Sequence, residues 1–263
     1  MEGRVARISI APVKALHVVN PAEVELGSAG VAGDRRFWLT EADGRLVNDK
    51  RYPRLLRVHA DWDEATRRLV LAFPDGLRVD GIVEPGDSVE PMLYDQPHPS
   101  RTVPGPWQDA LSEYVGKPLT LLWSEGGAVD RGVGGGAVTV ISHASVERLR
   151  EEAGVAGPID SRRFRMLFEI DGVEPHEEDE WIGRRVAIGD AVVAPVGDVG
   201  RCAVTTKNPD TGETDFDTLG TLAAYRREGR TEPLPFGVHA AVVQPGRVRV
   251  GDAVRPAPVA VRA

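Results

Sequence analysis

Glycine and proline interrupt this chain at short intervals. Of its 263 residues, 29 are glycine and 20 are proline, close to a fifth of the whole. Such a share disfavours long helices and supplies the turns that join short strands. Apolar residues make up 41% and charged residues 27%, which is the balance of a globular chain. The composition therefore favours a β-rich fold of one large domain or two smaller ones.

Alternation of apolar and polar residues predicts short antiparallel strands in the first half. Residues 5–10 alternate in this way, and the run at residues 37–40 leads to an Asp-Gly hairpin signal at residues 43–44. Residues 55–62 and 69–73 predict a further pair of strands.

Three short helices are expected between and after these strands. Pro106 is a favourable first helical residue, and Gly116 is suited to end that helix. Ser142 is the expected N-cap of the second helix, which stops near Gly154, and Asp217 precedes the third.

The second half contains a near-repeat. The string RVAIGDAV at residues 185–192 returns as RVRVGDAV at residues 247–254, each a strand that enters a Gly-Asp turn. Strands at this spacing with few helices suggest a closed barrel. We expect a mainly β fold with some α+β character. An antiparallel, β-barrel-like domain at residues 1–120 is followed by a second β-barrel at residues 121–260.

Charge and cysteine content exclude several classes of protein. The formal net charge of −8 disfavours nucleic acid as a partner, and no apolar run reaches the ~20 residues of a membrane span. The N-terminus lacks the apolar run of a signal peptide. Cys202 is the single cysteine, so an intramolecular disulfide, a four-cysteine zinc site and an iron–sulfur cluster are impossible. These features favour a cytoplasmic protein, and a redox enzyme of this kind needs electrons from a separate protein or a bound cofactor.

Two kinds of residue are candidates for chemistry. The cationic neighbour Arg201 favours the reactive thiolate of Cys202, although a buried core cysteine is the plainer alternative. Basic residues at strand ends are suited to bind a buried phosphate, although a solvated surface is again the alternative. They are Lys14, Arg35, Arg36 and Arg165. The glycine-rich string GVGGG at residues 132–136 is either an anion-binding loop or a mobile one.

Taken together, these strings resemble a known pair of domains. Three strings resemble the N-terminal β-barrel domain that accompanies MOSC domains: PVKAL at residues 12–16, AGDRRFWL at 32–39 and YPRL at 52–55. Four resemble the MOSC domain itself, named after the C-terminal domain of molybdenum cofactor sulfurase: RFR at 163–165, GRCAVTT at 200–206, PDTG at 209–212 and PFG at 235–237. Together the strings resemble the mitochondrial amidoxime-reducing components and their bacterial counterparts.

The resemblance implies a molybdenum cofactor, a molybdopterin, held between the two domains. Cys202 would be the metal ligand, since a soft thiolate suits a metal already held by sulfur. The other implied cofactor-binding residues are Lys14, Arg36, Gly135, Arg165 and Arg201. His239 falls where some relatives carry a tyrosine beside the site, which makes it a candidate catalytic residue together with Cys202.

The chain departs from the family pattern at four positions. Ala15 stands where relatives usually have a serine, so one phosphate-binding hydroxyl is missing. Met166 and Leu167 replace a Pro-Asn pair, and Asn208 replaces a common aspartate. These departures bear on the substrate more than on the cofactor.

The function implied by the resemblance is reduction of N-hydroxylated compounds by a cytoplasmic bacterial enzyme. Hydroxylamines and amidoximes would become amines and amidines, with electrons from a separate ferredoxin, cytochrome or flavin reductase. The enzyme would use the molybdenum cofactor and no pyridoxal phosphate. A first alternative is a sulfur carrier or cofactor-sulfurating protein with a persulfide on Cys202. A second is a cofactor-binding carrier without catalysis.

Overall fold

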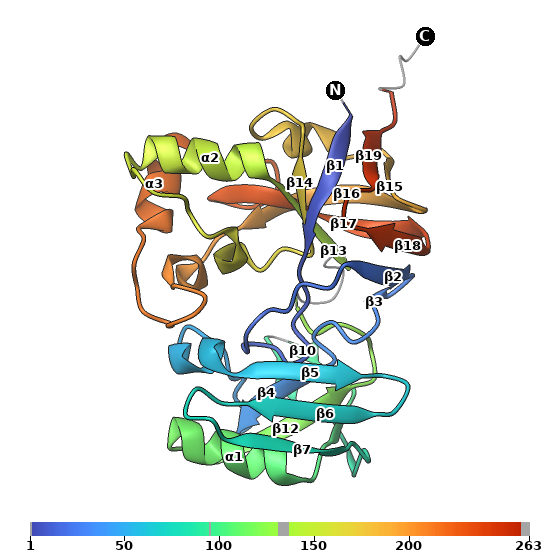
Figure 1. The fold of residues 1–263 in the computed structure, drawn as a ribbon, viewed down its shortest axis with the longest axis vertical. Helices are drawn as coiled ribbons and strands as arrows, with labels where there is room; N and C mark the ends of the chain where they lie inside the picture. Colours follow the sequence, from blue (N-terminus) through green and yellow to red (C-terminus); the bar gives the residue numbers. More distant parts are fainter. Residues whose placement is uncertain (1, 95, 131–136, 259–263) are drawn as a thin grey trace.

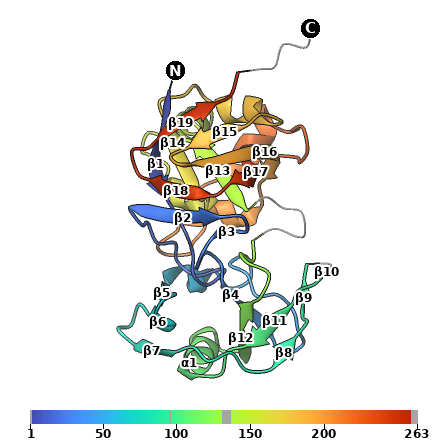
Figure 2. The same cartoon turned by 90° about the vertical axis from the view of Figure 1, so that its right-hand side faces the viewer.

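The computed structural model describes residues 2–94, 96–130 and 137–258, and it shows two bodies stacked along the long axis of the molecule (Figures 1 and 2). The upper body contains a closed barrel, and the lower body is built from small sheets. The mainly β fold expected from the sequence is confirmed. The first and last parts of the chain both lie in the upper body, and the middle part forms the lower one.

The barrel has seven strands in the order β1-β14-β13-β17-β16-β15-β19. Their bounds are β1 Gly3–Ile8, β13 Val138–Ser142, β14 Phe168–Asp171, β15 Val186–Ile188, β16 Ala191–Gly200, β17 Pro235–Gln244 and β19 Ala253–Pro256. All neighbours are antiparallel except β13 and β14. Buried aliphatic and aromatic side chains fill the interior, among them Ile8, Phe168 and Val238. A sheet in the order β18-β2-β3 lies beside the barrel, with β2 Glu23–Gly27, β3 Gly30–Val31 and β18 Gly246–Arg249.

The two copies of the near-repeat contact each other in the barrel. The strand of the first copy, β15, pairs with β19, which follows the Gly-Asp turn of the second. The Gly189 amide donates to the Ala253 carbonyl, and Asp190 donates to Arg247. A Cβ at Gly189 would lie 2.4 Å from the Asp252 carboxylate, so a glycine is required there.

The lower body contains three antiparallel sheets. One has the order β4-β12-β11-β8, with β4 Phe37–Glu41, β8 Ser88–Val89, β11 Ser100–Thr102 and β12 Leu119–Ser124. The others comprise β5 His59–Asp63, β6 Arg68–Ala72 and β7 Arg78–Ile82, and β9 Met92–Leu93 with β10 Gln96–Pro97. The indole of Trp107, from the helix that packs on β7, donates to the Leu69 carbonyl at 2.9 Å. The domain boundary expected between residues 120 and 121 falls inside β12.

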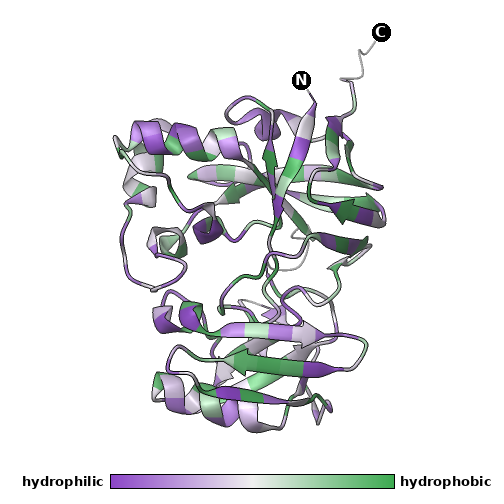
Figure 3. Cartoon of the chain, in the orientation of Figure 1, coloured by the Kyte–Doolittle hydropathy of each residue, from purple (hydrophilic) through white to green (hydrophobic). Residues whose placement is uncertain are grey.

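All three expected helices are present: α1 Pro106–Val115, α2 His143–Glu152 and α3 Thr218–Tyr225. Ser142 and Asp217 cap the second and third by accepting from backbone amides three residues later. Gly116 ends the first in the left-handed conformation. Hydrophilic and hydrophobic residues alternate along α1 and α2 (Figure 3). Within the described ranges, no helix has the length and apolar character needed to cross a bilayer.

One predicted strand is partly wrong. Instead of a single strand over residues 55–62, the chain forms the 3-10 helix η1, Pro53–Arg57, before β5 begins at His59. Proline is favoured at the start of a helical turn, and the adjacent Leu55 and Leu56 are both buried. Two consecutive buried side chains are incompatible with the alternation of a strand that is buried on one face.

Candidate functional site

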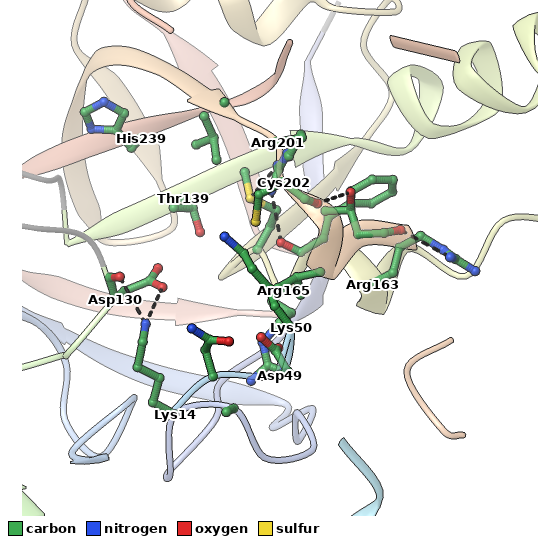
Figure 4. A pocket seen from close by; sticks show the side chains of 18 of the residues that line it. Lys14, Asp49, Lys50, Asp130, Thr139, Arg163, Arg165, Arg201, Cys202 and His239 are labelled. Carbon is green, nitrogen blue, oxygen red and sulfur yellow. Dashed lines mark hydrogen bonds and ion pairs between the residues drawn. The ribbon is translucent and has the colours of Figure 1, made fainter. Parts of the chain in front are cut away.

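A cavity of about 620 Å³ is lined by residues of both bodies (Figure 4). That volume is in the range of small-molecule and cofactor sites. The lower body and its connecting loops contribute Lys14, Ala15, Arg35, Asn48, Asp49, Lys50, Tyr94 and Asp130. The barrel side contributes Thr139, Arg163, Phe164, Arg165, Met166, Val199, Gly200, Arg201, Cys202, Val204, Thr205, Glu232 and His239. Five of the seven sequence-predicted site residues therefore meet at one place: Lys14, Arg165, Arg201, Cys202 and His239.

Cys202 lies two residues beyond the end of β16, where the chain enters the 3-10 helix η4, Ala203–Thr206. Its carbonyl accepts from the Thr205 amide and from the Thr205 hydroxyl, both at 3.0 Å. The Thr206 hydroxyl donates to the Ala203 carbonyl at 2.8 Å. The two threonines of the GRCAVTT string thus fix the turn behind the cysteine. The thiol is free, half-buried and on the cavity wall.

Arg201 holds the wall around the cysteine together. Its Nε donates to the Phe236 carbonyl at 2.9 Å, and Nη1 donates to the Phe164 carbonyl at 3.2 Å. Nη2 lies 3.0 Å from the Met166 sulfur. The guanidinium also lies 5.4 Å from the centre of the Phe164 ring. Arg201 therefore links the start of β17 to the end of the 3-10 helix η2, which spans Ser161–Phe164.

Arg165 brings a buried guanidinium from the barrel side toward the lower body. Its backbone is left-handed, with φ 54°, and Nη2 donates to the Leu16 carbonyl at 2.8 Å. Nε lies 3.8 Å from the Asp49 carboxylate. Burial lowers the pKa of Arg165, and the nearby Asp49 opposes that shift. Among the described residues, the Leu16 carbonyl is the one hydrogen-bond acceptor of this guanidinium, so donors remain for an anionic ligand.

Lys14 and Arg35 meet at the same carboxylate. The Lys14 ammonium donates to the Asp130 carbonyl at 3.1 Å and lies 3.8 Å from Oδ1. Arg35 Nε lies 3.3 Å from the same Oδ1, and Nη1 donates to Asp34 at 2.5 Å. Burial acts to lower the pKa of Arg35, but Asp130 and Asp34 outweigh it and raise that pKa. Arg35 also donates to the Arg165 carbonyl at 2.7 Å, so this charged group ties the two bodies together.

The structure puts Arg35, and not Arg36, on the cavity wall. Arg36 is absent from the described lining, and its guanidinium lies 4.4 Å from the centre of the Trp123 ring. Its buried Nε has no acceptor among the described residues. Arg35 adopts a left-handed backbone with φ 45° and takes the inward position. Gly135 lies outside the described residues.

His239 occupies the part of the wall opposite Lys14 in Figure 4. It belongs to β17, with Thr139 of β13 as its partner on one side and Gly197 of β16 on the other. A Cβ at Gly197 would lie 2.8 Å from His239 Nε2, so the glycine leaves room for the imidazole. A histidine and a threonine hydroxyl therefore share this part of the cavity.

The departures from the family pattern have different structural settings. Ala15 and Met166 line the cavity, whereas Leu167 is 1% exposed and packs in the barrel core. The Leu167 amide donates to the Thr139 hydroxyl at 2.8 Å. Asn208 accepts from the amides of the PDTG turn and donates its Nδ2 to Asp215 at 2.9 Å, a bond that an aspartate would not make.

Left-handed backbone is concentrated at the cavity. Of the seven described non-glycine residues with positive φ, four line it: Ala15, Arg35, Tyr94 and Arg165. Such conformations each cost on the order of 1–3 kcal/mol and persist where the surroundings fix them. Their concentration at the cavity indicates that the surrounding structure holds these side chains in place despite the backbone strain.

The sequence reasoning missed several lining residues as site residues. They are Asn48, Asp49, Lys50, Asp130, Thr139, Arg163 and Glu232. Most stand in loops with no motif around them. Thr139 could have been found from the sequence, because it lies in a strand of otherwise apolar, buried residues, where a buried hydroxyl is uncommon.

Comparison with known proteins identifies two domains in the chain. The model of the MOSC N-terminal beta barrel domain matches residues 2–91, and the model of the MOSC domain matches residues 129–255. The chain is 28% identical to mitochondrial amidoxime-reducing component 1 of Mus musculus over 284 residues, covering 96% of this chain and 82% of that protein. It is 26% identical to the molybdenum cofactor sulfurase of Oryza sativa over 253 residues, covering 84% of this chain.

The chain spans only 30% of the length of that sulfurase. Among solved structures, YuaD protein from Bacillus subtilis aligns over 97% of this chain and 94% of its own, with a TM-score of 0.44 and 11% identity. The two family models together account for most of the described chain. This protein therefore belongs to the MOSC domain proteins, with a MOSC N-terminal beta barrel domain joined to a MOSC domain.

Proposed function

We propose that this protein is a molybdenum cofactor-dependent oxidoreductase that reduces N-hydroxylated compounds. The observation that carries the proposal is the free Cys202 thiol, which shares one cavity with the largely buried guanidinium of Arg165. The similarity to amidoxime-reducing component 1 extends over 96% of the chain and supports the same reading.

The residues of the cavity fit such a cofactor. A half-buried thiol offers a soft ligand for molybdenum, and the unused donors of Arg165 offer bidentate bonds to a phosphate. Lys14 adds a point charge from the lower side of the cavity. Cys202 would hold the metal, and Lys14, Arg35 and Arg165 would hold the anionic end of the pterin.

The cofactor, when bound, would supply the two electrons of the reaction. For a hydroxylamine, R–NH–OH takes up two electrons and two protons, the N–O bond breaks, and R–NH2 and water leave. His239 would hold and deliver a proton at a ring nitrogen on the part of the wall opposite Lys14 (Figure 4). The electrons would come from a separate donor protein, because a single cysteine cannot hold an iron–sulfur cluster in this chain.

The first test is molybdenum content after expression in a host that makes the cofactor. We expect near-stoichiometric molybdenum and an oxidised pterin fluorophore in the wild type, and at least a tenfold loss of metal in Cys202→Ala. Reduction of a hydroxylamine with a chemical electron donor should be lost in the same variant. NADH alone should support no turnover.

Lys207→Ala is a matched control, because Lys207 follows η4 but does not line the cavity. Full metal content and full activity in Cys202→Ala would refute the proposal. Metal retained by the wild type without N-reduction from any donor would instead indicate a cofactor carrier.

A second candidate function is sulfur transfer through a persulfide on Cys202. It is favoured by the similarity to molybdenum cofactor sulfurase over 84% of the chain and by the free thiol. It predicts sulfide release from Cys202 on reduction and no retained molybdenum. Wild type loaded with metal and free of labile sulfur would exclude it.

A further inference from the structure

We infer that Asp179 and Arg226 form a positioning pair for Cys202, although neither is among the described residues that line the cavity. The inference rests on the proposed function, since it assigns the pair a role toward the residue that would hold the metal. Asp179 lies in the 3-10 helix η3, Glu177–Trp181, which packs against β16 and β17. Arg226 directly follows α3. The pair acts on the start of β17, to which the segment that carries Cys202 is bound.

The ion pair between Asp179 and Arg226 is largely buried and is directed at one backbone carbonyl. The two side chains are 14% and 16% exposed, and Arg226 Nη2 donates to Asp179 Oδ2 at 2.5 Å. Arg226 Nε donates at 3.0 Å to the carbonyl of Pro235, the first residue of β17. Within the described ranges, Arg226 is the one ion-pair partner of Asp179, whose second oxygen, Oδ1, is buried without a hydrogen-bond donor. The carboxylate therefore holds and orients a single guanidinium.

The next carbonyl of β17 is bound by the residue before Cys202. Arg201 Nε donates to the Phe236 carbonyl at 2.9 Å. Successive carbonyls of a strand point to opposite sides, so the two arginines hold the start of β17 from both sides. The backbone adds a direct link, because the Arg201 amide donates to the Leu234 carbonyl at 3.1 Å. A shift of the start of β17 would therefore shift the backbone that carries Cys202.

The turn before β17 is strained and depends on the bonds around it. Leu234 has a left-handed backbone with φ 50°, and its amide donates to the Arg227 carbonyl at 3.0 Å. A non-glycine residue keeps such a conformation only where its surroundings fix it. Without the bond from Arg226 to Pro235, this turn can relax toward ordinary backbone angles. The Arg201 amide then loses the fixed position of its acceptor.

Alkylation of the thiol tests the inference, because Cys202 is the single cysteine and all labelling reports on that one position. The rate constant for iodoacetamide is measured at one pH on the full chain, made in a host that lacks the cofactor. In Arg226→Lys, a compact ammonium can still pair with Asp179 but lacks the second donor arm that reaches Pro235. We expect alkylation about threefold faster or more in Arg226→Lys and in Asp179→Asn, since a loosened wall exposes the half-buried thiol.

Arg230→Lys is the matched control. Arg230 donates to Glu180 and so joins the same two segments, but this pair is exposed, and no bond from Arg230 to β17 is found among the described residues. Leu69→Ala removes a fully buried side chain of the lower body and controls for a general loss of stability. Both variants should alkylate within about 1.5-fold of wild type. Rates in Arg226→Lys and Asp179→Asn no higher than in Arg230→Lys, or an equal rise in Leu69→Ala, would overturn the inference.

Turnover of a hydroxylamine by the loaded enzyme provides the second measurement. In Arg226→Lys, kcat should fall about fivefold or more while KM stays within about twofold, because the pair acts on the metal ligand and not on substrate contacts. Unchanged kcat together with unchanged alkylation would overturn the inference and leave the proposed function intact. A wild type without molybdenum and without turnover would count against the proposed function. The alkylation rates, which need no cofactor, would still decide the role of the pair.

Discussion

The two sides of the cavity are built on different principles. On the lower side, Lys14 and Arg35 share Asp130, and the backbone of Arg35 is left-handed. On the barrel side, Cys202 follows the long strand β16, and its thiol forms no disulfide. The charged groups of the lower side therefore contribute to holding the two bodies together, whereas the thiol does not. Stability and chemistry should respond to different substitutions.

The largest effect on stability is expected from Arg35→Ala. The side chain is 5% exposed and pairs with Asp34 and Asp130, so its removal leaves the buried Asp34 carboxylate without its cationic partner. Breaking a buried pair in this way costs about 3–5 kcal/mol. Urea unfolding should show that loss, whereas Cys202→Ala should change the free energy of unfolding by less than about 1 kcal/mol.

The exposed cavity residue Lys50 supplies the control, and Lys50→Ala should lie within about 0.5 kcal/mol of wild type. An equally small loss for Arg35→Ala would show that the charges of the lower side do not hold the bodies together.

The sequence predicted the thiol side better than the charged side. The GRCAVTT string pointed to Cys202, which lies on the cavity wall, and cap residues located all three helices, because both signals are local. The charged side depends on which of two adjacent arginines turns inward. The left-handed backbone of Arg35 turns Arg35 inward instead of the expected Arg36. Nothing in the sequence string distinguishes the two arginines. The strand error at Leu55 has a similar cause, since a proline-initiated turn replaced an extended segment.

The second largest effect is expected where the loop after Cys202 meets the lower body. Gly212 has φ 76°, and a Cβ there would lie 2.3 Å from the Pro53 carbonyl. Gly212→Ala should cost about 2–3 kcal/mol from strain and displacement together. Gly154→Ala has a similar φ of 65° with open space around it, so it should cost only about 1 kcal/mol. Equal losses in thermal or urea unfolding would mean that the contact with Pro53 is unimportant.

Alanine-to-glycine substitutions on the two sides of the cavity should change the free energy of unfolding in opposite directions, by smaller amounts. Ala15 lines the charged side with φ 73°, so Ala15→Gly relieves strain and should stabilise by about 0.5 kcal/mol. Ala203 lies in η4 behind the thiol, where Ala203→Gly should destabilise by about 0.5–1 kcal/mol. Parallel urea unfolding of the two variants measures this difference in sign. Two losses of equal size would show that the left-handed residue carries no strain.

The smallest effect is a pH dependence at the seam between the bodies. Burial lowers the pKa of His17, helped by the neighbouring His59 and Arg162 and opposed by the hydrogen bond to the Leu56 carbonyl and by Asp210. The unfolded chain then binds a proton near pH 6.5 that the folded chain takes up only at lower pH, so stability falls as the pH drops below about 6.5. The free energy of unfolding should fall less in His17→Gln than in wild type between pH 7 and 5. If the free energy of unfolding depended on pH equally in both proteins, His17 would not be the group responsible.

The topology of the barrel constrains the order in which parts of the chain can fold during synthesis. β1 must pair with β14, more than 150 residues later, and with β19 near the other end of the chain. A ribosome therefore delivers the complete lower body long before the barrel can close. The first strand remains unpaired while β4 to β12 fold, and the cavity gains the last part of its second wall only when β17 has emerged. Newly made chains that stall before β17 would present an incomplete pocket, and those that stall before β19 would leave an open strand edge as a target for chaperones or aggregation.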